Sequence, residues 1–238
     1  MGILENELFT NEGWLFLLRW LHFLAGITWI GVLYYFNFIQ TPFFGSELGG
    51  TARSAMMRGL VPNALWWFRW GAMFTFLTGW TILIMHMISG TGNMAYYTLV
   101  LTGGTMGTIM WFNVWFVIWP IQQGLIANAE AGAAGGQADE AAAARAPIAA
   151  RASRTNTLLS LPMLFFMGAA RHLQGFVDKT EPSYGPYLGI MLVIVLLVEA
   201  NIWAGTAATQ KPLGSVSGTI HLGLGVTLVL FLFATNML

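Results

Sequence analysis

The four histidines are the residues of this sequence with the most telling chemistry, because each one falls within a long apolar stretch. They are His22, His86, His172 and His221. An ionisable side chain at that depth in a bilayer costs about 2.5 kcal/mol or more unless it faces a partner, water or a cofactor. Neutral imidazole is a good ligand for iron. The histidines therefore indicate either a bound cofactor or structural hydrogen bonds.

Chain direction predicts that three of the histidines lie in one leaflet. Successive spans cross the bilayer in opposite directions, so His22, His86 and His172 fall in the same half, and His221 in the other. A haem with two histidine ligands needs the ligating nitrogen atoms only about 4 Å apart, twice a metal–imidazole distance of about 2 Å. We expect two of the three histidines to be the metal ligands of a haem b. His86 and His172 match best in depth, with His22 about one turn deeper. A copper site, a proton relay and purely structural roles remain open.

Small and aromatic residues share helix faces with these histidines. At helical spacing, His22 aligns with Gly26 and Trp29, His86 with Gly79, and His172 with Gly168. A flat macrocycle needs such gaps beside a helix, although glycine is also common where membrane helices pack together.

Two arginines lie in the same leaflet as the three histidines. Arg19 and Arg171 suit the anionic propionates of a haem, because a guanidinium binds a carboxylate through two parallel hydrogen bonds. Alternatively, Arg19 extends to the membrane surface and Arg171 is a charge at a loop edge. We therefore include both arginines in the candidate cofactor site.

The composition indicates which kind of secondary structure must hold these side chains in place. The 238 residues are 56% hydrophobic and 8% charged, far below the roughly 25% charged residues of soluble domains. We predict an all-α, polytopic transmembrane bundle forming a single domain in the lipid bilayer. Its six spans are expected at about 14–40, 63–88, 94–119, 157–176, 185–207 and 217–237.

Several shorter segments complete this organisation. We expect residues 51–60 to form a short interfacial segment, and the polar segment 121–156 to be a cytoplasmic loop with one or two short helices. Gly103 and Gly107 have the spacing of close helix packing. Asn113 needs a buried partner. Glu199 and His221 are expected to lie near each other, where they either form a hydrogen-bonded pair or bind a small polar ligand.

Charge and cysteine content exclude several classes of site. The sequence has no cysteine, so it offers no thiolate metal site and no covalent c-type haem attachment. A net charge near zero gives no signal for nucleic acid. Lysine and arginine gather in the loops opposite the N-terminal side, which predicts a bacterial inner membrane protein with both termini in the periplasm.

Four stretches carry a resemblance to a known family. LHFLAGITWIGVLYYFNFIQ, FRWGAMFTFLTGW, MWFNVWFVIWP and SRTNTLLSLPMLFFMGAARH resemble the membrane domain of bacterial membrane-bound urate oxidases. The first stretch, with His22, Thr28-Trp29, Gly31 and Tyr34-Tyr35, is also similar to the first helix of bacterial membrane protoporphyrinogen oxidases.

The resemblance implies a membrane redox protein that works with cytochrome c. It carries over His22 and His172, and also Trp29, Asn113 and Pro120. The urate enzymes typically end in a cytochrome c domain with a CxxCH motif, and this sequence contains no such motif. We therefore expect electrons to pass from a quinol or small organic donor to a separate cytochrome c or a larger membrane complex. The alternatives are a non-catalytic accessory subunit and, with less support, a transporter.

Overall fold

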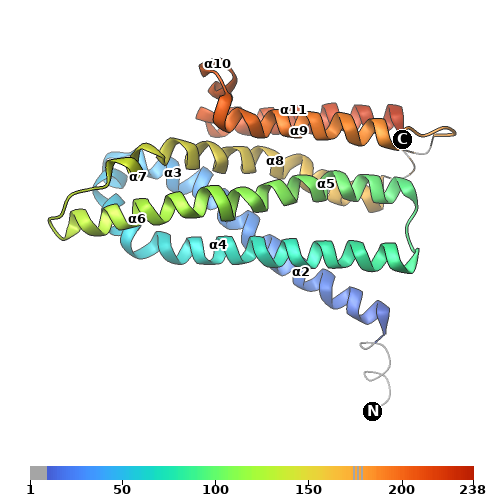
Figure 1. The fold of residues 1–238 in the computed structure, drawn as a ribbon, viewed down its shortest axis with the longest axis horizontal. Helices are drawn as coiled ribbons and strands as arrows, with labels where there is room; N and C mark the ends of the chain where they lie inside the picture. Colours follow the sequence, from blue (N-terminus) through green and yellow to red (C-terminus); the bar gives the residue numbers. More distant parts are fainter. Residues whose placement is uncertain (1–9, 174, 176, 178) are drawn as a thin grey trace, which may run out of the picture.

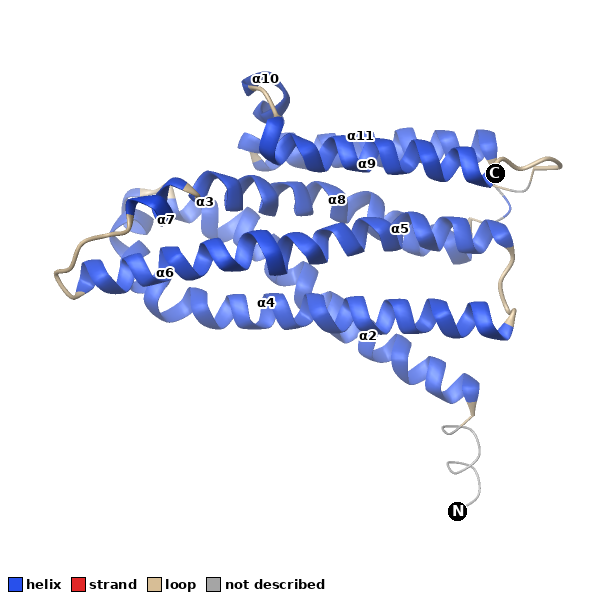
Figure 2. Ribbon diagram, viewed as in Figure 1, coloured by secondary structure: helices blue, strands red, loops and turns tan. Residues whose placement is uncertain are grey.

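The computed structural model describes residues 10–173, 175, 177 and 179–238, and these residues form a helical bundle without strands. Seven longer helices lie along the bundle (Figure 1; Figure 2). They are α2 (Asn11–Tyr34), α4 (Glu47–Ser89), α5 (Met94–Phe112), α6 (Trp119–Ala133), α8 (Ala146–His172), α9 (Tyr184–Ala204) and α11 (Val216–Met237). Short helices connect or extend them: η1 (Tyr35–Gln40), α3 (Thr41–Phe44), η2 (Asn113–Ile118), α7 (Glu140–Ala144), α10 (Ala207–Gln210) and η4 (Lys211–Gly214). The all-α prediction is confirmed.

Five helical stretches of the described chain are long and apolar enough to cross a membrane. They are 11–44, 47–89, 94–133, 184–204 and 216–237. The predicted span at 157–176 corresponds to α8, which is not among them because it carries a band of polar side chains. Figure 1 shows α8 alongside the other long helices. Since that band is buried against protein, α8 does not need the composition of a lipid-facing helix.

Two predicted boundaries differ from the structure because helices run through their prolines. The 43-residue α4 contains Pro62 and joins the segments predicted at 51–60 and 63–88. Helix 94–133 continues past Pro120, so α6, α7 and the start of α8 occupy most of the predicted loop 121–156. At 1.5 Å per residue α4 is about 65 Å long, about twice the hydrocarbon thickness. Figure 1 shows α4 and α6 extending beyond α9 and α11.

A π-helical segment precedes two of the prolines and explains why the helix continues. Proline lacks an N–H and its ring clashes with the carbonyl four residues earlier. η1 ends two residues before Pro42 and η2 ends two residues before Pro120. The N–H groups of Thr41 and Trp119 bond to carbonyls five residues back. The wider turn therefore accommodates each proline without ending the helix.

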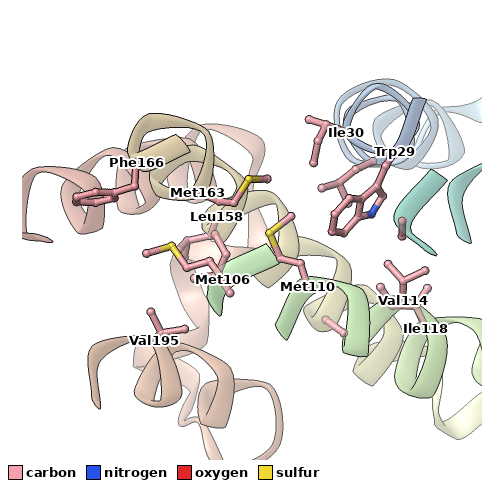
Figure 3. Close-up of a cluster of buried hydrophobic side chains, with 14 of the residues drawn as sticks. Trp29, Ile30, Met106, Met110, Val114, Ile118, Leu158, Met163, Phe166 and Val195 are labelled. Carbon is pink, nitrogen blue, oxygen red and sulfur yellow. The ribbon is translucent and has the colours of Figure 1, made fainter. Parts of the chain in front are cut away.

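The core is centred on α8, which packs against α5, α9, α11 and both π-helical segments. Figure 3 shows Trp29 pointing from α2 towards Met110 and Val114. Trp29 is 1% exposed. Leu158 and Met163 of α8 lie near Met106 in the same view. The outer faces of the other long helices are therefore the surfaces available to contact lipid.

Glycines allow the closest helix approaches. A Cβ added at Gly103 would lie 3.1 Å from the Met163 carbonyl oxygen, so the predicted close packing at this glycine is confirmed. A Cβ at Gly71 would lie 3.0 Å from the Trp29 backbone nitrogen and 3.2 Å from the Ala25 carbonyl oxygen. Backbone atoms cannot yield as a flexible side chain can, so Gly71 sets the spacing of α2 and α4.

We predict that Gly71→Val lowers the thermal stability of the detergent-purified protein. The larger side chain forces α2 away from α4, at a cost of about 1–3 kcal/mol. Gly59→Val is the matched control, because Gly59 lies in the same helix with no atom within 4 Å of an added Cβ. Equal Tm values for the two variants would contradict the close contact.

Candidate functional site

His22 lies between α2 and α4, with its ring held by α4. Its Nδ1 is 3.0 Å from the Thr78 hydroxyl oxygen. The Thr78 hydroxyl donates to the Phe74 carbonyl at 2.6 Å. The single hydroxyl hydrogen is thus committed, and Thr78 accepts from the His22 Nδ1–H.

This arrangement defines the tautomer of His22. With the proton on Nδ1, the Nε2 atom carries the lone pair, and among the described residues Nε2 has no hydrogen-bond partner. Histidines that bind metals characteristically donate their other N–H to a neighbouring acceptor, which fixes the tautomer and the ring orientation. His22 therefore presents an imidazole nitrogen of the kind that can bind a metal ion.

Gly79 and Gly26 lie where α4 and α2 meet around His22. A Cβ at Gly79 would be 2.9 Å from the His22 Cε1 atom. Gly79, predicted to share a face with His86, therefore makes room for the His22 ring. A Cβ at Gly26 would be 3.9 Å from the Thr75 side chain. Gly26 thus faces an ordinary helix contact with α4.

His86 is engaged by Arg19. The Arg19 Nη2 donates to the His86 Nε2 at 2.8 Å, since a guanidinium has no acceptor. The His86 Nδ1–H then donates to the Thr91 hydroxyl at 2.7 Å. The Tyr97 hydroxyl donates to the His86 carbonyl at 2.8 Å. Every polar atom of the His86 ring has a partner, and its lone pair faces Arg19 instead of open space.

Tyr96 of α5 links this group to α8. Its ring lies edge-on to His86, with 5.8 Å between centroids. Its hydroxyl interacts electrostatically with both Arg19 and Arg171. The two predicted arginines are therefore close enough to Tyr96 for their charges to act on it.

His172 is the last residue of α8. His172 and Arg171 are exposed, and His172 has no hydrogen bond to another described residue. Gly168, one turn earlier, is exposed and an added Cβ there would meet no atom within 4 Å. The predicted gap beside His172 is therefore open.

The three histidines differ in depth more than the sequence predicts. Thr78, the partner of His22, precedes His86 by slightly over two helical turns, or about 12 Å along the axis. Helix α5 packs against both α4 and α8, which carry His86 and His172. Among the described residues no group of three His, Cys, Asp or Glu side chains is placed to hold a metal ion. His22 and His172 each have a ring nitrogen without a hydrogen-bond partner among the described residues.

A second polar group, buried in the middle of the bundle, surrounds Asn113. The Asn113 Nδ2 donates to the Asn156 Oδ1 at 3.0 Å and to the Glu199 Oε2 at 2.9 Å. The Asn156 Nδ2 donates to the Met110 carbonyl at 2.9 Å, which fixes the direction of the chain of bonds. Asn113 and Asn156 are both 0% exposed. Sequence reasoning identified Asn113 as needing a partner but did not identify Asn156.

Glu199 and His221 do not form the predicted pair. Glu199 bonds to Asn113, whereas the His221 Nδ1 lies 2.7 Å from the Ser217 carbonyl of its own helix. His221 is exposed. Its role is therefore local, because an exposed imidazole needs no partner on a neighbouring helix.

Comparison with known proteins identifies a family match over the larger part of the chain. Residues 85–230 match the family model described as urate oxidase N-terminal. No curated protein and no solved structure matches the chain. The matched region includes His86, Asn113 and His172, whereas His22 and Arg19 precede it.

We predict that Asn113→Leu destabilises the protein by about 1–3 kcal/mol, because it leaves buried oxygens of Asn156 and Glu199 without their donor. Thermal unfolding in detergent measures the effect. Asn236→Leu is the control, since exposed Asn236 bonds only to the Leu232 carbonyl of its own helix. A Tm for Asn113→Leu equal to that of the control would show that the buried network contributes nothing to stability.

Proposed function

The chain belongs to the urate oxidase N-terminal family, and from this premise we propose that it is a membrane redox protein that binds haem b. In this proposal it passes electrons from a quinol or small organic donor to a periplasmic cytochrome c or a respiratory complex. The family match supports a relation to the membrane part of urate oxidase. The apolar helices suit a lipid bilayer. The end of the bundle that carries Arg53, Arg58, Arg145, Arg151 and Lys211, called the arginine-rich end, is assigned to the cytoplasm by the positive-inside rule.

The proposal rests on the hydrogen bonding of the His22 ring. Its Nδ1–H is anchored on Thr78 and its Nε2 lone pair is uncommitted. The Thr78 oxygen also holds the ring plane fixed, which lowers the entropy lost when the nitrogen binds iron. Haem, when bound, supplies a one-electron carrier. His172, exposed beside the open surface at Gly168, is the second ligand in this proposal.

Arg19 and Arg171 have a distinct part in the proposal. Both are exposed and both act on Tyr96, and no acidic side chain among the described residues forms an ion pair with either arginine. They are therefore free to bind the propionates. His86 holds Arg19 in place through its Nε2, and is assigned a positioning role instead of a ligand role.

A non-catalytic accessory subunit is the second candidate, and one observation favours it. The His22 ring is packed against Gly79, so α2 and α4 leave no space for a macrocycle on that side of the ring. In this alternative the histidines only form hydrogen bonds between helices. The two candidates differ in whether the purified protein contains haem.

We predict a b-type absorption band in the reduced-minus-oxidised spectrum of the purified protein, together with haem in a pyridine haemochrome assay. His22→Ala and His172→Ala are each expected to lose the band, because each removes an iron ligand. His86→Ala is expected to retain it, with altered electron-transfer rates to added cytochrome c.

His221→Ala is the matched control, since exposed His221 bonds only within its own helix. Size-exclusion profiles and Tm values distinguish ligand loss from unfolding. A wild-type protein without haem, purified from haem-replete cells, would refute the redox proposal and favour the accessory role. A band lost with His86→Ala but kept with His22→Ala would refute the ligand assignment.

A further inference from the structure

Arg154 of α8 is a largely buried residue whose guanidinium has no hydrogen-bond partner among the described residues. Its side chain is 8% exposed, and its Nη1 atom is buried without a hydrogen bond. No described residue forms an ion pair or hydrogen bond with its guanidinium. The Nε and Nη2 atoms keep access to solvent, but the unpaired N–H groups at Nη1 are donors that an anion would satisfy.

Helix geometry places Arg154 against the start of α11. Leu158 and Leu161 lie on the same α8 face, and an added Cβ at Gly223 would be 2.8 Å from the Leu158 carbonyl oxygen. One to two turns further along, Phe165 contacts Phe231, with 5.3 Å between ring centroids. The two helices therefore run parallel. One turn before Leu158, Arg154 lies opposite the first turn of α11.

The first turn of α11 contains backbone N–H groups that are available as hydrogen-bond donors. Ser215 caps the helix: its Oγ accepts from the Gly218 N–H at 3.0 Å, and its carbonyl accepts from the Thr219 N–H at 3.1 Å. The N–H groups of Val216 and Ser217 have no partner among the described residues. These two donors and the helix dipole favour an anion at this position.

The neighbouring segments cannot supply that anion. The sequence contains no aspartate or glutamate between residues 141 and 177, nor after Glu199. Glu199 itself bonds to Asn113, which contacts α8 through Asn156. Asn156 and Arg154 are two residues apart, about 200° around the helix, so they face different neighbours. Lys211, in η4, adds further positive charge.

We propose that Arg154 and the first turn of α11 bind a phosphate-type oxyanion at the arginine-rich end of the bundle. The planar guanidinium and two backbone N–H groups match the oxygens of a phosphate group. The site lies at the N-terminal end of α11, where an apolar helix begins and where lipid headgroups are expected. The phosphate is either a free ion or the headgroup of an acidic phospholipid.

The test compares wild type with Arg154→Gln by thermal unfolding. In phosphate-free buffer and phosphatidylcholine nanodiscs, Arg154→Gln is expected to be about as stable as wild type, because it removes a partly desolvated charge whose Nη1 atom has no partner. Inorganic phosphate, against chloride of equal ionic strength, or phosphatidic acid added to the nanodiscs, then raises the wild-type Tm by about 3 °C or more. The variant does not respond.

The response identifies the source of the phosphate group. A shift with inorganic phosphate assigns a free anion, and a shift with phosphatidic acid alone assigns a headgroup. Arg58→Gln is the control, because exposed Arg58 at the same end bonds only to the Ser54 carbonyl of its own helix, and it should respond like wild type. If Arg154→Gln does not fold, Arg154→Lys replaces it and should show a weaker shift. Equal responses of wild type and the Arg154 variant, or no response to either ligand, would overturn the proposal.

Discussion

The enclosure of α8 by apolar helices is the constraint on which this structure depends. Asn156 and Ser160 are each 0% exposed, so lipid never solvates their polar atoms. A helix satisfies its own backbone, but polar side chains at membrane depth need partners within the protein. Asn156 bonds to Asn113 and the Met110 carbonyl, and Ser160 lies 2.8 Å from the Tyr34 hydroxyl. These contacts hold α2, η2 and α8 in one arrangement.

Both π-helical segments contact α8 through an asparagine. Asn37 in η1 donates to the Ser153 hydroxyl at 2.8 Å, and Asn113 in η2 donates to Asn156 at 3.0 Å. π-helical turns are rare and are frequent at functional sites. Here the wider turn both accommodates a proline and brings an asparagine to the polar helix. The resulting polar layer lies between the end of the bundle that carries His86 and His172 and the arginine-rich end.

Composition was sufficient to predict the helical class, because low charge over long apolar runs leaves few alternatives. The continuation of helices through Pro62 and Pro120 was not predictable from local rules, since proline normally ends a helix and a π turn has no clear sequence signal. The approach of Arg19 to His86 also depends on tertiary packing, because the residues are 67 positions apart. Spacing alone assigned Gly79 to the His86 face, whereas the crossing of α2 and α4 places it against the ring of His22. The missing partner of Arg154 became visible only once its burial was known.

Cysteine cross-linking in membranes tests most directly whether α8 lies inside the bundle. The chain has no native cysteine, so the pair Asn37→Cys and Ser153→Cys can be made without background. The account predicts efficient cross-linking of this pair by a short thiol reagent, because the two side chains are in hydrogen-bond contact. Asn37→Cys combined with Leu164→Cys, whose side chain is 48% exposed further along α8, is predicted to remain unlinked. Failure of the first pair, or equal linking of both, would contradict the enclosure of α8.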